Sequence, residues 1–515
     1  MPNENDRRIA RNAIYLYGRM MLTIFVSLYT SRVILDVLGV ADYGVYNVVG
    51  GIVVILGFLN GTMSGATQRF LSYELGAGDP AKLRKTFSAA LTVHAAIALG
   101  MFVLAETVGL WYVNNELVIA PERMAAANWT YQFSVLAAVI TIFQIPYLAA
   151  IMAHERMGYY ALVAMANVFL KLAIVLVVQF IAAADNLSIY ASLVFLVAAI
   201  VAAMYIIYGR RNFAECRWSL RHNDSHIVKS LLKFCSWDVY GNLCYTTRFQ
   251  GMLVILNRFG GTVLNAAGGL CATVSATINS FAASVITAFR PQIIQQYAKG
   301  DYPYMLKLLD NCARFSLLLL GLLIIPLITG MDKLLELWLV DPPRYTADFC
   351  RLALVAVCGE LMHSVIGIGI HATGNVIRIS FISGTLFLLE LPVMWFLLVY
   401  TGNPTVIYMV HIAMVFMIIY VDSLILKVQL SAFKVGRFWL KGIFTPMLII
   451  GVTYAIVAAV THGWDFDILL LLAMGVFSTA VLAALSWLFA IDGDMRRSIA
   501  GKIRSRLCPG HRQTS

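Results

Sequence analysis

Ionisable side chains inside otherwise apolar segments are the residues of this 515-residue chain that could do chemistry. Arg32, Lys171 and Arg248 are basic, and Glu360 and Glu390 are acidic. A charge at bilayer depth is costly, so such residues usually face a water-filled cavity or a charged partner. Arginine keeps its charge at depth and binds phosphate groups bidentately, whereas buried carboxylates readily take up protons. These five positions are therefore the first candidates for a functional site.

Most of these residues also have a structural explanation. Arg32 can pair with Asp36, one turn later, or extend its charge to the interface. Lys171 can pair with a glutamate across a helix interface, and Glu390, two residues before a proline, can border a kink. Arg248 is the hardest to explain in this way, because its neighbours are themselves polar.

The segment around Arg248 reads SWDVYGNLCYTTRFQG and includes Asp238 and Asn242. The next apolar segment carries Asn265 among many hydroxyl groups, and the second segment of the chain carries Asn47 among others. These polar groups cannot all face hydrocarbon, because an unsatisfied polar group there costs several kcal/mol. We therefore expect the first, second, seventh and eighth segments to line a hydrated cavity.

The bulk composition places these segments in a membrane. The chain is 60% hydrophobic and 13% charged, with a mean hydropathy of +0.79, whereas soluble domains are roughly 45–50% apolar and about 25% charged. Windows of about 20 apolar residues, enough to cross a bilayer, recur fourteen times and leave no loop that could hold another domain. We expect an all-α polytopic membrane protein. The windows are 12–38, 44–67, 86–113, 124–152, 159–181, 188–208, 230–257, 262–289, 305–330, 349–372, 376–400, 405–430, 439–461 and 467–490.

The net charge of +11 reflects topology. Most of the 38 lysines and arginines fall in the segments on the side of the termini, so the positive-inside rule makes both termini cytoplasmic. This distribution argues against nucleic acid as a partner. The polar start MPNENDRRIAR leads into a long apolar run without a cleavage pattern, so the first helix is expected to be retained. The eight cysteines are scattered without CxxC spacing, which predicts no disulfide framework and no metal site.

An internal repeat divides the chain into two halves. The seven-residue stretch VILDVLG at 33–39 is similar to VILNRFG at 254–260, and several later residues recur in the same order. The first six helices are thus echoed by the next six, which predicts bundles related by a pseudo-twofold axis along the membrane normal. The expected organisation is a bundle at 1–208, a linker at 209–229, a bundle at 230–430, two extra helices at 431–490 and a basic tail at 491–515. The matching positions are Asn47 with Asn265, Arg69 with Arg290, and Gly78-Asp79 with Gly300-Asp301.

The stretches SRVILDVLGVADYGVYNVVGG and QRFLSYELGAGD, together with the turn AHERMGYY, resemble bacterial polysaccharide flippases. These O-antigen and exopolysaccharide translocases belong to the multidrug/oligosaccharidyl-lipid/polysaccharide exporter superfamily. The resemblance implies a V-shaped pair of six-helix bundles with two extra helices, working by alternating access. It also implies a polyprenyl-pyrophosphate-linked oligosaccharide as cargo, moved from the inner to the outer leaflet of the bacterial cytoplasmic membrane.

The resemblance assigns cationic residues on the first and seventh helices to the pyrophosphate. Because burial raises carboxylate pKa values, the buried acids and a histidine could couple transport to protons or sodium, or could form structural pairs. The motifs predict no enzyme activity, metal or cofactor, and a monomer is expected because one chain completes the cavity. The expected partners are membrane lipids, a polysaccharide polymerase and other assembly proteins. The expected substrate-binding residues are Arg32, Arg248, Lys171, Asn47, Asn265 and Asn242. The expected ion-coupling residues are Asp238, Glu360, His363 and Glu390.

Two other functions remain open. A drug/cation antiporter of the same superfamily would share the fold and rely on cavity acids. A membrane glycan polymerase or ligase would act on the same lipid-linked sugars, but it would need a substantial outer loop with catalytic groups. The longest outer connection, residues 331–348, is short and has no histidine or paired-carboxylate arrangement, and the chain has no Walker loop.

Overall fold

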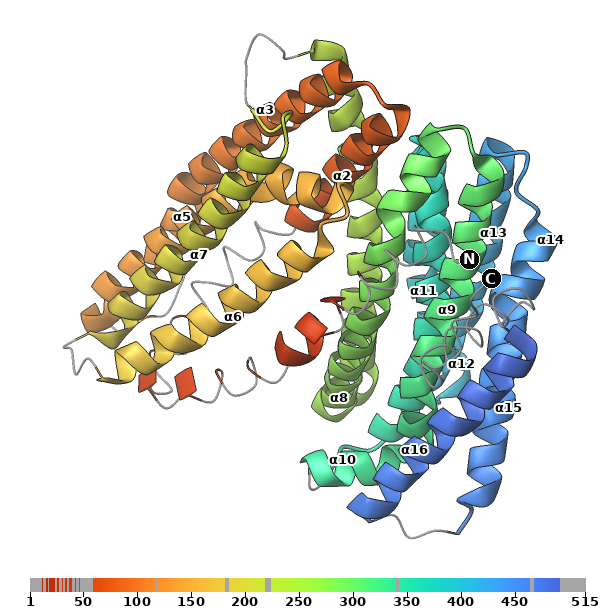
Figure 1. The fold of residues 1–515 in the computed structure, drawn as a ribbon. Coiled ribbons are helices and arrows are strands. Elements are labelled where there is room, and N and C mark those ends of the chain that lie inside the picture. The colour runs from red at the N-terminus through yellow and green to blue at the C-terminus, as the bar shows by residue number, and fades with distance from the viewer. Residues whose placement is uncertain are drawn as a thin grey trace, which may run out of the picture. The chain divides into compact units, whose positions relative to one another are not determined.

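The computed structural model describes individual positions between 12 and 46, and then residues 59–115, 119, 121–180, 185–217, 224–339, 342–463 and 467–490. These residues form α-, π- and 3-10 helices and no strand (Figure 1). The expected all-helical fold class is therefore confirmed. The chain forms two compact units that divide between Val239 and Tyr240, inside the helix expected to begin at residue 230.

The N-terminal unit comprises residues 12–239 with 297–300. Its helices pack around α5, which contacts α2, α3 and α7, and α6 lies against α7. Figure 1 shows α5 and α7 running side by side. The helices are α2 (Leu59–Ala77), α3 (Pro80–Leu104), η1 (Ala105–Gly109), α4 (Leu110–Asn115), η2 (Pro121–Arg123), α5 (Met124–Ala153), α6 (Met157–Phe180) and α7 (Asn186–Asn212).

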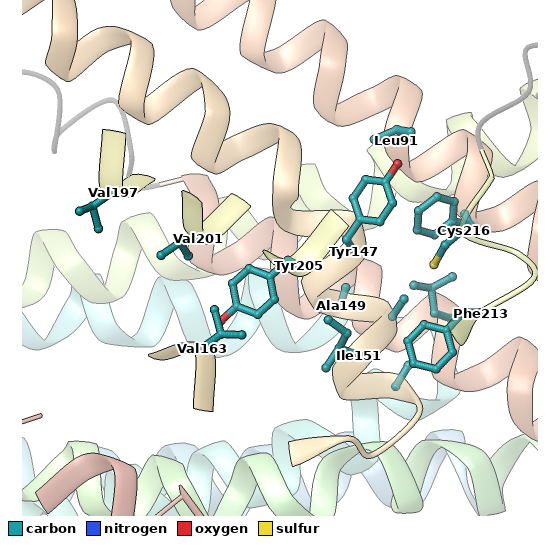
Figure 2. Packing of buried hydrophobic residues seen from close by; sticks show 14 of the residues in the cluster. Leu91, Tyr147, Ala149, Ile151, Val163, Val197, Val201, Tyr205, Phe213 and Cys216 are labelled. Atoms are coloured by element: carbon teal, nitrogen blue, oxygen red, sulfur yellow. The ribbon is translucent and has the colours of Figure 1, made fainter. Parts of the chain in front are cut away.

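The core of this unit gathers apolar side chains from α3, α5, α6 and α7 (Figure 2). Tyr147 of α5 is buried and packs edge-on against Phe87 of α3, with ring centroids 5.1 Å apart. Tyr205 of α7 and Val163 of α6 are also buried in this cluster. Lipid tails are as apolar as these side chains, so close van der Waals packing holds the four helices together inside a membrane.

The segment after α7 is tied back to the turn between α5 and α6. The Nε2 atom of His154 lies 2.5 Å from a carboxylate oxygen of Glu215, and the His154 ring stacks on Phe213 with centroids 4.0 Å apart. Burial alone would raise the pKa of Glu215, but its hydrogen bonds with His154 and with the backbone, together with the nearby imidazole charge, lower that pKa overall. Part of the expected linker at 209–229 is therefore packed structure.

The C-terminal unit contains the rest of α8 and the helices after it. Helix α11 packs against α13 and α9, and α12 packs against α13. A short helix, α10, occupies part of the expected outer connection at 331–348. The helices are α8 (Ser225–Ala298), α9 (Tyr302–Thr329), α10 (Met331–Leu339), α11 (Thr346–Thr373), η4 (Ile379–Ser383), α12 (Gly384–Thr401), α13 (Val406–Gln429), α14 (Val435–Phe438), η5 (Trp439–Phe444), α15 (Thr445–Val460), α16 (Ile468–Leu485) and η6 (Ser486–Ala490).

Helix α8 is continuous in hydrogen bonding but doubles back on itself. Arg248 and Asn279 both bond to the Glu360 carboxylate. In a straight helix these two residues would lie about 46 Å apart. The two expected helices at 230–257 and 262–289 are therefore two arms of α8, although no non-helical turn separates them.

Eleven helices in the described part of the chain are long and apolar enough to cross a membrane. They correspond to eleven of the fourteen expected windows. The windows at 12–38 and 44–67 lie mostly outside the described residues, and the first arm of α8 is helical but too polar to qualify. The expectation of a polytopic membrane protein is confirmed by these spans.

The internal repeat is visible as matching local geometry. Gly78 and Gly300 adopt left-handed φ angles of 75° and 77°, which glycine permits without steric cost. Asp79 and Asp301 follow as helix N-caps, each accepting a hydrogen bond from the backbone N–H three residues later, at 3.0 Å and 3.1 Å. The same glycine–aspartate pair therefore starts α3 in one unit and α9 in the other.

Gly109 is required by the close approach of a tyrosine. A Cβ atom at this position would lie 2.0 Å from the hydroxyl oxygen of Tyr131, which is fully buried and donates to the carbonyl of Ala105 at 2.7 Å. We expect Gly109→Ala to cost about 1–3 kcal/mol of stability through this overlap. Thermal unfolding in detergent measures it against Gly100→Ala, whose Cβ would have no neighbour within 4 Å. Equal unfolding temperatures for the two variants would contradict the expectation.

The two extra helices dock on α9. Both α15 and α16 pack against it, and Arg314 of α9 donates from Nη1 to the carbonyl oxygen of Ala490 at 2.6 Å. A cation at a helix C-terminus meets the negative end of the helix dipole, and a charged hydrogen bond contributes about 1.5–3 kcal/mol. Arg314 is thus an intramembrane arginine with a structural role.

We expect Arg314→Met to loosen α15 and α16 selectively. Hydrogen exchange should become faster in residues 435–490 and stay unchanged in α11 and α13. Arg437→Met is the matched control, because the Arg437 side chain is 62% exposed and lies 3.9 Å from Asp310. A long pair of this kind, in which the arginine is exposed and Asp310 is 15% exposed, is expected to contribute about 0–1 kcal/mol. Faster exchange across the whole C-terminal unit would show that Arg314 supports more than the extra helices.

Candidate functional site

A cluster of charged side chains lies buried in the C-terminal unit. The Arg248 side chain is 2% exposed, and its Nη2 donates to Oε1 of Glu360 at 3.0 Å. Two further donors reach the same carboxylate: the hydroxyl of Tyr245 at 2.9 Å and the side-chain amide of Asn279 at 3.1 Å. Both oxygens of Glu360 are therefore hydrogen-bonded within the protein, as buried carboxylates require.

His411 of α13 bridges two glutamates. Its Nδ1 lies 2.6 Å from Oε1 of Glu390, and its Nε2 lies 3.2 Å from Oε1 of Glu360. The Nη1 of Arg248 lies 3.3 Å from Nε2 and 3.5 Å from Nδ1 of the same ring. A protonated imidazole donates from both nitrogens. With His411 protonated, two cations balance two carboxylates and the cluster is neutral.

A second cluster lies further along α13. Asp422 is completely buried and accepts two hydrogen bonds, from Nδ1 of His363 at 2.6 Å and from the hydroxyl of Ser383 at 2.5 Å. The π-helical segment η4 ends at Ser383 and presents this hydroxyl to α13. The Phe387 ring lies between the two clusters, 5.4 Å from the His363 ring and 5.8 Å from the Arg248 guanidinium.

The structure brings together some of the predicted site residues. Arg248, Glu360 and Glu390 share the first cluster, and His363 belongs to the second. The two Nη groups of Arg248 face Glu360 and His411, and its Nε is buried without a hydrogen-bond partner among the described residues, so Arg248 is not an open phosphate ligand in this structure. This differs from the expected cavity role, and the reason is that Glu360 and Glu390 lie on helices packed around it.

The other predicted residues lie elsewhere. Asp238 is half-buried and belongs to the N-terminal unit, whereas the acids of the clusters belong to the C-terminal unit. Asn242 is exposed on α8, where Thr246 and Gln250 continue the same exposed polar face. Arg32, Asn47 and the Asn265 side chain lie outside the described residues.

Lys171 is a cation that is open to its surroundings. It lies in α6, about 21 Å along the helix from Met157 and about 14 Å from Phe180. The side chain is exposed, although it shares a helix face with the buried residues Val175 and Val178. No carboxylate within the described ranges forms an ion pair with it. A cation at this depth without a counter-charge among the described residues is expensive, which makes Lys171 a candidate for function.

Sequence reasoning missed His411 and Asp422. Each is the only residue of an apolar stretch, YMVHIAMVF or MIIYVDSLIL, that can carry a charge near neutral pH. The rule that intramembrane ionisable residues are functional candidates would have selected both. Their partners could not be identified, because those partners lie on other helices.

The comparisons with known proteins show the fold. No protein-family model and no curated protein matches this sequence. Several solved structures match over 84% of the chain. One is an outward-facing multidrug resistance MATE family transporter of the MOP superfamily, with 13% identity, 97% of that chain covered and a TM-score of 0.68. Another is a MATE protein in the bent conformation, with 12% identity, 96% of that chain covered and a TM-score of 0.69.

A third is a MOP superfamily transporter from Pyrococcus furiosus, described as having a binding pocket of reverse polarity that suggests a different function. It has 11% identity, 99% of its chain covered and a TM-score of 0.66. The chain therefore has the fold of this transporter superfamily. At these identities the likeness defines architecture, and the cargo has to be argued from the residues.

Proposed function

We propose that this protein translocates a polyprenyl-pyrophosphate-linked oligosaccharide across the bacterial cytoplasmic membrane by alternating access, driven by an ion gradient. The observation that carries the proposal is Lys171, an exposed cation deep in a membrane-spanning helix. A pyrophosphate head is anionic, and burying it in hydrocarbon without compensation would be prohibitive. A lysine held in the membrane lowers that cost through charge-assisted hydrogen bonds to phosphate oxygens.

The polar face of α8 supports the sugar part of the proposal. Asn242, Thr246 and Gln250 recur at intervals of four residues and are exposed, as are Thr273 and Thr277 on the second arm. Hydroxyl and amide groups at helical spacing offer both donors and acceptors to a glycan. The sequence motifs that resemble polysaccharide flippases point to the same cargo.

The acids of the C-terminal unit favour a second candidate, a drug/cation antiporter. Glu360, Glu390 and Asp422 lie within one unit, and antiporters of this fold would use acids to bind cations. The arginine and histidines among them reduce this attraction, because they already supply positive charge to the same carboxylates. We therefore place the acids in ion coupling and the cargo contact at Lys171.

Deletion of the gene, with analysis of lipid-linked oligosaccharides on the two leaflets, tests the proposal. We expect the oligosaccharide to accumulate on the cytoplasmic leaflet and to return to normal when the protein is restored. Unchanged glycans with increased sensitivity to cationic drugs would favour the antiporter. Accumulation of unpolymerised oligosaccharide on the outer leaflet would instead indicate a polymerase or ligase.

A further inference from the structure

The two titratable clusters of the C-terminal unit are separate sites at different depths. His411 lies five residues after the start of α13 at Val406, and Asp422 lies seven residues before its end at Gln429. Their separation of eleven positions corresponds to about 16 Å along the helix axis. By the expected topology the His411 cluster is nearer the outer face, and the Asp422 cluster is nearer the cytoplasm.

The charges of the first cluster sum to zero only when His411 is protonated. Loss of that proton leaves two carboxylates against one guanidinium, a net negative charge among side chains that are almost fully buried. An uncompensated buried charge is strongly disfavoured, so a proton or a cation has to return. The titratable and charged groups facing His411 are Arg248 and Cys271 on α8, Glu360 on α11 and Glu390 on α12. Tyr408 lies one turn earlier on the same helix and interacts with Cys271 and Arg248.

The second cluster follows the same logic with its own histidine. Within the described residues, the imidazole of His363 is the one group that can place a positive charge beside Asp422. Protonation of His363 neutralises this buried carboxylate, whereas a neutral His363 leaves its charge supported only by hydrogen bonds. The groups facing His363 are Asp422 from α13, Ser383 from η4, the Phe387 ring from α12 and Glu360 one turn earlier on α11.

The most exposed acid or histidine of each cluster lies on the same face of α11. The side chains of Glu360 and His363 are 13% and 25% exposed, whereas those of Glu390, His411 and Asp422 are 5% exposed or less. Residues three apart on a helix share a face. A proton arriving at this face of α11 can therefore reach either cluster, through the carboxylate of Glu360 or the imidazole of His363.

We propose that the C-terminal unit carries two separate proton sites, one on His411 between Glu390 and Glu360 and one on His363 beside Asp422, both loaded through the shared face of α11. The proposal deepens the proposed transport function and rests on it for the use of the protons. It implies that two protons bind per cycle. Proton binding itself can be measured without any glycan.

The hydrogen bonding of the two clusters favours protons over sodium ions. Each oxygen of Glu360 and Asp422 already accepts from an N–H or O–H group, and Glu390 accepts from His411 through Oε1. At these oxygens a sodium ion would have to displace the donors. Oε2 of Glu390 is buried without a hydrogen-bond partner among the described residues, but a sodium ion there would be repelled by Arg248. A proton needs only one imidazole nitrogen.

Potentiometric titration of the purified full-length protein in detergent tests the proposal. Proton uptake between about pH 9 and about pH 5 covers the histidine range. We expect the double variants His411→Gln/Glu390→Gln and His363→Gln/Asp422→Asn each to bind about one proton fewer per chain, and their combination about two fewer. Each double variant removes one base and one acid, so the remaining cluster stays balanced.

The variant His154→Gln/Glu215→Gln calibrates the loss expected from one histidine–carboxylate pair outside the membrane spans. Replacing KCl with NaCl at constant ionic strength should leave the uptake unchanged. Unaltered uptake in His363→Gln/Asp422→Asn, a combined loss of only one proton, or displacement of protons by sodium would each overturn the proposal.

Ser383→Ala keeps the test decisive if a double variant does not fold. This substitution removes one hydrogen bond to Asp422 and changes no charge. We expect it to move one step of the wild-type titration curve and leave the other in place. A curve that stays unmoved would contradict the second site. Two proton sites in a protein whose deletion leaves lipid-linked oligosaccharides unchanged would retain this inference and reject the proposed cargo.

Discussion

Replacing Arg248 with methionine is expected to lower the free energy of unfolding by about 3–5 kcal/mol. The guanidinium is 2% exposed and is one of two cations that balance Glu360 and Glu390. Its removal leaves one carboxylate without a counter-charge inside the helix bundle. Thermal unfolding of the purified protein in detergent measures the effect, and transport is expected to be lost with it.

The double variant Arg248→Met/Glu360→Met separates charge balance from packing. It leaves Glu390 with His411, a neutral pair at 2.6 Å, so we expect it to be more stable than the single arginine variant. Arg351→Met is the control for loss of an arginine at the surface, where its partner Asp332 is 68% exposed; it should cost about 0–1 kcal/mol. A double variant no more stable than Arg248→Met would show that the arginine acts mainly through its packing.

Replacing Lys171 with methionine is expected to reduce transport without reducing stability, unlike the replacement of Arg248. Stability should be maintained or increased, because the substitution removes a charge that no carboxylate in the described part of the chain pairs with. In a membrane-spanning helix a lysine costs about 2.5–3.5 kcal/mol on insertion scales. Translocation should fall about 10- to 100-fold, because charge-assisted hydrogen bonds to phosphate are worth about 1.5–3 kcal/mol. Flipping of lipid-linked oligosaccharide in inverted membrane vesicles measures the transport rate.

Lys171→Arg is the matched control, because it keeps the positive charge at the same depth and should retain most of the activity. Phe169→Ala is a second control, since Phe169 is exposed two residues earlier on α6 and carries no charge. Normal flipping by Lys171→Met would remove the main support for an anionic cargo at this helix. A fall in stability equal to that of Arg248→Met would mean that Lys171 has a partner in the folded protein.

The contrast between Arg248 and Lys171 shows how far sequence reasoning reaches. Both are basic residues near the middle of long apolar segments, and both were expected to bind substrate. Polar neighbours along the chain made Arg248 the stronger candidate, yet those neighbours include the exposed Asn242 and Thr246 rather than its true partners. Its partner Glu360 comes from a helix more than a hundred residues later.

The sequence by itself determined the all-helical membrane class, the positions of most spans and the repeated glycine–aspartate helix start. These properties depend on contiguous residues, because hydrophobic length and helix capping act within one segment. Only the tertiary structure decided which charged side chains are paired with an opposite charge and which remain exposed. Pairs such as His363 with Asp422 form between helices, so their compensation depends on packing that no single segment specifies.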